Sequence, residues 1–82
     1  MIPSWSLGSS KELTDFYTIV GHNVKRIRTS KGVTQMQLAL AIGHNSVGHI
    51  AKAELNKYGK HFSLEQLYKI SKILNVPISS FF

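Results

Sequence analysis

The side chains with the most evident chemistry in this sequence are basic, and they gather in its later part. Residues 20–82 hold nine Lys and Arg against two acidic residues, a net charge of +7, whereas the whole chain of 82 residues carries +6. The nine residues are Lys25, Arg26, Arg28, Lys31, Lys52, Lys57, Lys60, Lys69 and Lys72. Ammonium and guanidinium groups concentrated in this way favour binding to the phosphates of a nucleic acid.

The sequence argues against several other kinds of chemistry. It contains no cysteine, which excludes disulfides, thiolate zinc sites and thiol nucleophiles. The four histidines lack the spacing and the neighbouring carboxylates of a metal site; they are His22, His44, His49 and His61. No serine lies in a nucleophile elbow, and there is no glycine-rich phosphate loop. We therefore expect no enzyme activity, no metal and no cofactor.

Length and hydropathy limit the architecture. A chain of 82 residues suffices for one small domain, and 43% hydrophobic residues can supply one core. The longest apolar run, Leu38–Ile42, is far shorter than the roughly 18 residues of a membrane span. Residues 1–5 have neither a basic leader nor an apolar stretch behind them, unlike a secretory signal. We expect a cytoplasmic module that does not associate with membranes.

The segments that carry the basic residues have the apolar periodicity of helices. Residues 1–10 contain Pro3, Gly8 and four serines without apolar periodicity, so residues 1–15 are interpreted as a flexible arm running into the first helix, and 16–82 as the domain. Ser9 and Glu12 have the spacing of a capping box at the start of the first helix, whereas Gly21 favours a helix that starts later, near Phe16. The first helix, which ends before Gly32, has an apolar stripe at Leu13, Phe16, Val20, Val24 and Ile27.

Three more helices follow by the same criteria. Thr34 and Gln37 form a capping-box spacing ahead of Leu38, Ala39 and Ile42, and Gly43 ends that short helix. Asn45 or Ser46 can cap a helix that runs from Val47 to Glu54 or Leu55. Ser63 and Gln66 begin a helix with the buried stripe Leu64, Leu67, Ile70 and Leu74, which residues 75–77 terminate. Residues 78–82 form a last apolar turn. With no period-two segment between turns, the prediction is an all-α fold.

One segment has the pattern of a known motif. Gly32–Gly43 follows the order Gly, apolar, Ser or Thr, Gln, two variable residues, Leu-Ala, two variable residues, apolar, Gly. In this it resembles the phage-repressor (Cro/cI-type, xenobiotic-response-element or XRE) helix-turn-helix family. Residues 24–28, 50–54 and 63–82 resemble that family's first helix, the end of its recognition helix, and its fourth and fifth helices. The resemblance implies a five-helix, lambda-repressor-like DNA-binding domain.

Two departures from the family pattern concern the recognition helix. Gly43 and Glu54 are eleven steps apart, where the family usually has ten, which indicates a turn one residue longer. His44 and Ala53 also replace residues that are usually large and apolar. We expect the packing beneath this helix to be thin or rearranged.

The resemblance also implies which residues contact DNA. With Ser46 as cap, the base-facing positions fall on Val47, Gly48 and Lys52, and His49 and Asn45 become candidates if the longer turn shifts the register. Lys52 can donate to guanine O6 and N7, and Val47 can contact a thymine methyl group. Gln35 is expected to bind a phosphate beside the N–H groups of its helix start and to brace the recognition helix, although Thr34 and Gln37 would cap the helix of Gln35 in either case. The phosphate contacts expected from the following loop are Lys57, Tyr58 and Lys60.

Two structural roles complete the expectation. Arg28 and Glu54 match a pair that forms an ion pair in related repressors, the alternative being two solvated charges on separate faces. Terminal apolar residues predict a dimer contact; the expected interface comprises Val76, Ile78, Phe81 and Phe82. The sequence thus predicts a sequence-specific regulator of transcription, a repressor or controller that binds a two-fold operator in double-stranded DNA as a homodimer. The alternative is an antitoxin or partner-binding module that uses the same fold, or regulation by a separate protein.

Overall fold

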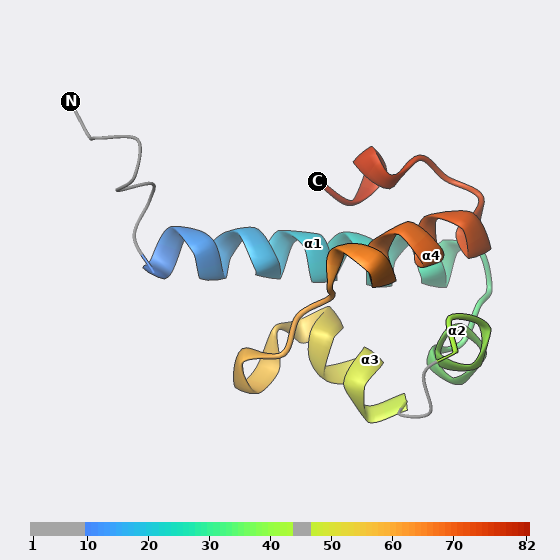
Figure 1. Ribbon diagram of the computed structural model, residues 1–82, viewed down its shortest axis with the longest axis horizontal. Coiled ribbons are helices and arrows are strands. Elements are labelled where there is room, and N and C mark those ends of the chain that lie inside the picture. Colours follow the sequence, from blue (N-terminus) through green and yellow to red (C-terminus); the bar gives the residue numbers. More distant parts are fainter. Residues whose placement is uncertain (1–9, 44–46) are drawn as a thin grey trace.

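The computed structural model describes residues 10–43 and 47–82, and within these ranges the protein is helical without any strand (Figure 1). The prediction of an all-α fold is confirmed. The expected fifth helix is a single four-residue 3₁₀ helix, so a count of five α-helices is not confirmed. The elements are α1 (Ser10–Ser30), α2 (Gln35–Ala41), α3 (Val47–Leu55), η2 (Lys57–Gly59), α4 (Leu64–Leu74) and η3 (Ile78–Phe81).

Helix α1 takes the earlier of its two predicted starts. It begins at Ser10 and continues through Gly21 without interruption, so the proposed boundary between residues 15 and 16 falls inside the helix. The Ser9 half of the expected capping box lies outside the described residues. The helix ends where Gly32 adopts a left-handed φ of +71°, a conformation that a residue without Cβ adopts at little cost.

The predicted apolar stripe of α1 is buried only in its second half. Val20, Val24 and Ile27 are at most 7% exposed, whereas Leu13 and Phe16 are 54% and 45% exposed. The N-terminal half of α1 extends beyond the other helices, and the molecule measures 44 × 26 × 20 Å (Figure 1). The periodicity therefore gives the correct face of the helix, but the first half of that face is only partly covered by its own chain.

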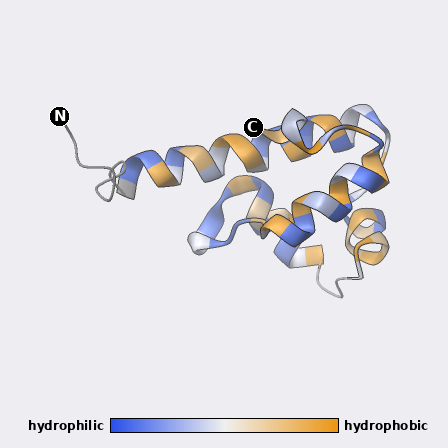
Figure 2. Ribbon diagram, turned by 45° about the horizontal axis from the view of Figure 1, so that its top comes forward, coloured by the Kyte–Doolittle hydropathy of each residue, from blue (hydrophilic) through white to orange (hydrophobic). Residues whose placement is uncertain are grey.

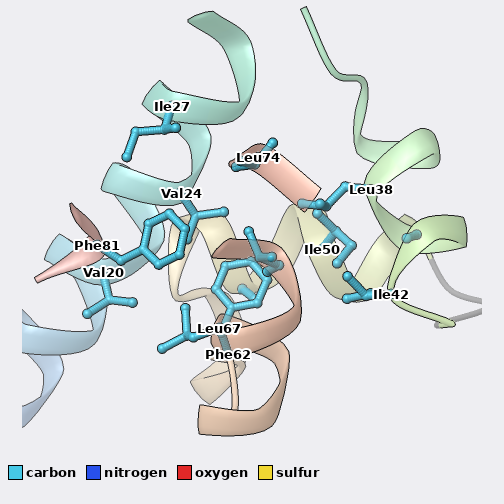
Figure 3. Packing of buried hydrophobic residues seen from close by; sticks show 13 residues of the cluster. Val20, Val24, Ile27, Leu38, Ile42, Ile50, Phe62, Leu67, Leu74 and Phe81 are labelled. Atoms are coloured by element: carbon cyan, nitrogen blue, oxygen red, sulfur yellow. The ribbon is translucent and has the colours of Figure 1, made fainter. Parts of the chain in front are cut away.

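The core surrounds the second half of α1. Residues from α2, α3, α4 and η3 meet there, with Phe62 and Phe81 supplying the aromatic part (Figure 3). Phe81 has no exposed surface at all, which contradicts its expected place on an exposed dimer contact, whereas Phe82 is 54% exposed. Val76 and Ile78 are partly buried against the same core. Of the four expected interface residues, Phe82 is exposed, Val76 and Ile78 are half-buried, and Phe81 is buried.

Helices α1 and α3 approach each other closely at a pair of small residues. A Cβ placed on Gly21 would lie 2.5 Å from the carbonyl oxygen of Ala53 and 2.7 Å from that of Glu54. Ala53 is fully buried at this crossing. Of the two expectations for the packing beneath α3, thin or rearranged, the structure agrees with the second: a small residue on each helix lets the two backbones touch, so no large side chain is needed between them.

The caps of α2 and α4 confirm the predicted capping boxes. The Thr34 hydroxyl accepts from the Gln37 N–H at 3.0 Å, and the Gln37 side chain accepts from the Thr34 N–H at 2.8 Å. Ser63 and Gln66 make the same reciprocal pair at the start of α4. At the other end of α4, Asn75 is left-handed with φ 55°, and its N–H caps the last turn. Local sequence thus fixes where both helices begin and end.

Candidate nucleic-acid interface

A buried ion pair holds the end of α1 to the end of α3. Arg28 donates from Nε to Glu54 Oε2 at 2.6 Å and from Nη2 to Glu54 Oε1 at 3.0 Å, and the two residues are 8% and 2% exposed. Arg28 Nη1 also donates to the Val33 carbonyl oxygen at 2.8 Å. The expected pair is present, with the bidentate geometry that a guanidinium and a carboxylate favour. It joins α1, the loop before α2, and α3 into one unit.

Gln35 makes a contact to α3, as the resemblance implies for a residue that braces the recognition helix. Its Nε2 donates to Glu54 Oε1 at 2.9 Å, and its side chain is half-buried between α2 and α3. Glu54 therefore accepts from both Arg28 and Gln35, so that three helices share one carboxylate. No described side-chain nitrogen or oxygen is buried without a partner. The network sets the angle between α2 and α3, the two helices of the expected motif.

Helix α3 has an outward face made of few residues. Gly48, Lys52 and Leu55 are exposed at steps of four and three residues. Ile50, Ala53 and Glu54 point into the body of the protein. Val47 is half-buried and packs against the core. The candidates Asn45 and Ser46 lie outside the described residues, as does the turn that was expected to be one residue longer. The exposed face of α3 is accordingly narrow and carries one positive charge.

His49 contacts α4. Its Nε2 lies 3.3 Å from Gln66 Nε2 and 3.4 Å from Gln66 Oε1, and its ring meets Phe62 edge-on with centroids 6.4 Å apart. The side chain is half-buried in this position. Gly48 and Lys52 therefore lie on the exposed side of α3, whereas His49 faces α4, beside the residue that also caps that helix.

The loop after α3 presents a basic and aromatic surface. Lys57, Tyr58 and Lys60 are all exposed, and Lys52 Nζ lies 5.9 Å from the centre of the Tyr58 ring. Tyr58 is 80% exposed and has φ 55° and ψ 33°, a left-handed conformation that costs an aromatic residue roughly 1–2 kcal/mol. The loop thus holds a large ring in water at an energetic cost and places it next to Lys52.

The lysines of α4 differ from those of α3 and its loop. Lys69 Nζ lies 3.3 Å from a carboxylate oxygen of Glu65, and Lys72 Nζ lies 5.3 Å from the centre of the Tyr68 ring. Both therefore interact with neighbours on their own helix. Within residues 10–43 and 47–82, no three His, Asp or Glu side chains gather as a metal site would require, and no helix there is long and apolar enough to cross a membrane.

These features define a class of protein. A long helix, a short capped helix and a second short helix, fixed by a shared buried carboxylate, present an exposed helix face and a basic loop on the same part of the chain. This is the arrangement of a helix-turn-helix DNA-binding domain.

The comparison with known families identifies the class more closely. The profile of the helix-turn-helix family of the XRE (Cro/cI) type matches residues 24–81, more than half of the chain, and the protein belongs to this family. Its members are DNA-binding regulators of transcription and typically not enzymes. No curated protein matches the chain significantly.

The site also contains residues that the sequence analysis missed. Gly21 was considered only as a sign of a later helix start, although it allows α1 and α3 to touch. Gln66 was considered only as a cap, although it also contacts His49. The role of Gly21 could have been found from the presence of two small residues, Gly21 and Ala53, in helices that were expected to pack together. No pattern in the sequence indicated that Gln66 would contact His49.

Proposed function

We propose that this protein is a sequence-specific regulator of transcription, a repressor or controller that binds a two-fold operator in double-stranded DNA as a homodimer. The observation that carries the proposal is the exposed face of α3, with Gly48 and Lys52 one turn apart on a helix whose orientation is fixed by Glu54. A helix presented in this way fits the major groove, where each base pair offers a distinct set of donors and acceptors.

The base contacts are assigned to the start and centre of α3. Lys52 donates to guanine O6 and N7, and Val47 lies at the edge of the face, where a thymine methyl group can reach it. Gly48 lets the helix backbone come close to the DNA because it has no side chain. Asn45 and Ser46 precede this face in the sequence, so they remain candidates for contacts at its N-terminal end.

The backbone contacts are assigned to the flanks of α3. Lys57, Tyr58 and Lys60 form the loop on one side, and Gln35 begins α2 on the other. The Gln35 amide, which already donates to Glu54, is proposed to meet a phosphate at the start of α2, where backbone N–H groups favour an anion. Contacts of this kind hold the protein in register but distinguish sequences little.

The division between base and backbone contacts can be tested with two lysine variants. We expect Lys52→Ala to weaken binding to the duplex that the protein selects from a random pool by about 1–3 kcal/mol, with little effect on random DNA. Lys57→Ala should weaken binding to both duplexes alike and lower the salt dependence by about one phosphate contact. Fluorescence anisotropy titrations at several salt concentrations measure both effects. Equal losses of the two variants on both duplexes would contradict the assignment.

A further inference from the structure

An apolar groove lies on the N-terminal half of α1, away from the α3 face. We call it the α1 groove and define it by Phe16, Tyr17, Leu64, Leu67 and Phe82, which line a hollow of about 300 Å³. Phe16 and Phe82 stack across it with ring centroids 6.1 Å apart and an angle of 21° between their planes. Leu64 is 73% exposed at its edge. The groove is thus built from three segments that are far apart in the sequence.

The walls of the groove are fixed by contacts within the chain. On one side, Asn23 Nδ2 donates to the carbonyl oxygen of Phe81 at 3.0 Å and ties the C-terminal segment to α1. On the other side, the rings of Tyr17 and His61 stack with centroids 3.8 Å apart and planes 8° from parallel. Because both walls are held by contacts that need no ligand, the groove is already formed in the single chain.

The helix that forms the floor of the groove is itself an exposed apolar surface. Leu13, Phe16 and Ile19 are all 45–54% exposed, and no side chain of residues 11–19 is buried. Figure 2 shows hydrophobic and hydrophilic bands alternating along this projecting part of α1. Contiguous apolar surface of this kind is typical of an interaction site in a small protein.

Charge indicates where two copies of the chain can meet. Each copy carries +6, so two copies repel each other over most of their surface. The first turns of α1 are an exception, because Glu12 and Asp15 outnumber Lys11 there; Lys11 pairs with Asp15 at 3.0 Å, which leaves an excess of one negative charge. Half of the chain's four acidic residues therefore lie on the same helical segment as the exposed apolar residues.

We infer that the α1 groove is the surface through which two copies of this chain associate, each contributing the projecting half of α1 to the groove of the other. Such an interface is isologous, since one patch serves as both the apolar helix and the groove that receives it. This inference rests on the proposed function, in which the protein binds DNA as a homodimer. It places the dimer interface on α1 in place of residues 76–81, and Phe82 stays part of it.

The association is tested by sedimentation equilibrium over a wide range of protein concentrations. The wild type should form dimers, and Phe16→Glu should raise the dimer dissociation constant at least about tenfold, because it puts a charge into the buried centre of the interface. Leu40→Glu is the matched control, since Leu40 is 69% exposed on α2, outside the groove, and should leave the constant unchanged. Circular dichroism verifies that both variants are folded.

Three results would overturn the inference. One is a wild type that stays monomeric at every concentration, and another is an equal effect of the two variants. The third is a monomer in which Phe16→Glu shifts the fluorescence of Trp5, the chain's one tryptophan. That would assign the groove to residues 1–9 of the same chain.

DNA binding separates this inference from the proposed function. Phe16→Glu should bind a single half-site as tightly as the wild type and lose at least about tenfold in affinity for the two-fold site. If neither protein prefers any duplex, the proposed function fails, whereas the sedimentation result still decides whether the groove joins two copies.

Discussion

The two halves of α1 carry the same apolar stripe but have different surroundings. In residues 20–30, Val20, Val24 and Ile27 are covered by α3, α4 and η3, and Arg28 is paired with Glu54. In residues 11–19, the stripe continues through Leu13 and Phe16, which stay 54% and 45% exposed even though Phe82 stacks on Phe16. Periodicity therefore tells which face of a helix is apolar, while burial depends on what the rest of the chain places over it. The second half is a structural support for α3, and the first half is available for association.

The largest difference in stability is expected between variants of two adjacent aromatic residues, Phe81 and Phe82. Phe81 packs in the core on the second half of α1, so Phe81→Ala should lower the free energy of unfolding by about 4 kcal/mol. Phe82 stacks on Phe16 of the first half and is 54% exposed, so Phe82→Ala should cost less than about 1 kcal/mol. Urea unfolding measures both. Similar losses of unfolding free energy in the two variants would contradict the difference in burial between the two halves of α1.

The next largest loss of unfolding free energy is expected when the ion pair between Arg28, in the second half of α1, and Glu54 is broken. Arg28→Met leaves the Glu54 carboxylate buried with the Gln35 amide as its remaining side-chain donor, and we expect a loss of about 3 kcal/mol. The double variant Arg28→Met/Glu54→Gln should recover part of that loss, because no charge is then left buried. A double-mutant cycle by urea unfolding checks this, and strictly additive losses would argue against coupling of the two residues.

Close contact between α1 and α3 predicts a smaller loss. Gly21→Ala places a methyl group against backbone carbonyl oxygens that can yield only if the helices separate, so it should cost about 2 kcal/mol despite the better helix propensity of alanine. Ile19→Ala, in the exposed half of the same helix, should cost less than about 0.5 kcal/mol. Thermal unfolding compares the two, and a neutral Gly21→Ala would mean that the helices are not in contact.

The smallest effect concerns the strained loop beside α3. Tyr58→Gly relieves the left-handed strain and should raise the free energy of unfolding by about 0.5–1 kcal/mol, while weakening binding to every duplex. Tyr58→Ala is the control, because it removes the ring but keeps a Cβ in the left-handed conformation. Unfolding and anisotropy titrations are measured on the same samples. A variant that gained stability without losing DNA affinity would remove Tyr58 from the interface.

The local parts of this structure could be predicted from the sequence because their causes are local. The caps at Thr34 and Ser63 follow from residues three positions apart, and the pairing of Arg28 with Glu54 followed from the family pattern. For Gln35 the resemblance implied a brace on the recognition helix, and the structure adds Glu54 as its acceptor. The contacts that were missed depend on how helices cross. Gly21 against Ala53 joins residues 32 positions apart, and Phe81 and Phe82 look equivalent in sequence. Only the packed structure shows that one is core and the other is surface.

The central claim is that this chain recognises a DNA sequence through α3. The most direct test is selection from a randomised duplex library with the purified protein at near-physiological salt, followed by sequencing of the retained DNA. The account predicts enrichment of a two-fold motif whose half-sites lie about ten base pairs apart, or one helical turn. Salt-sensitive retention without any enriched motif would contradict it, because the basic surface would then bind only the phosphate backbone.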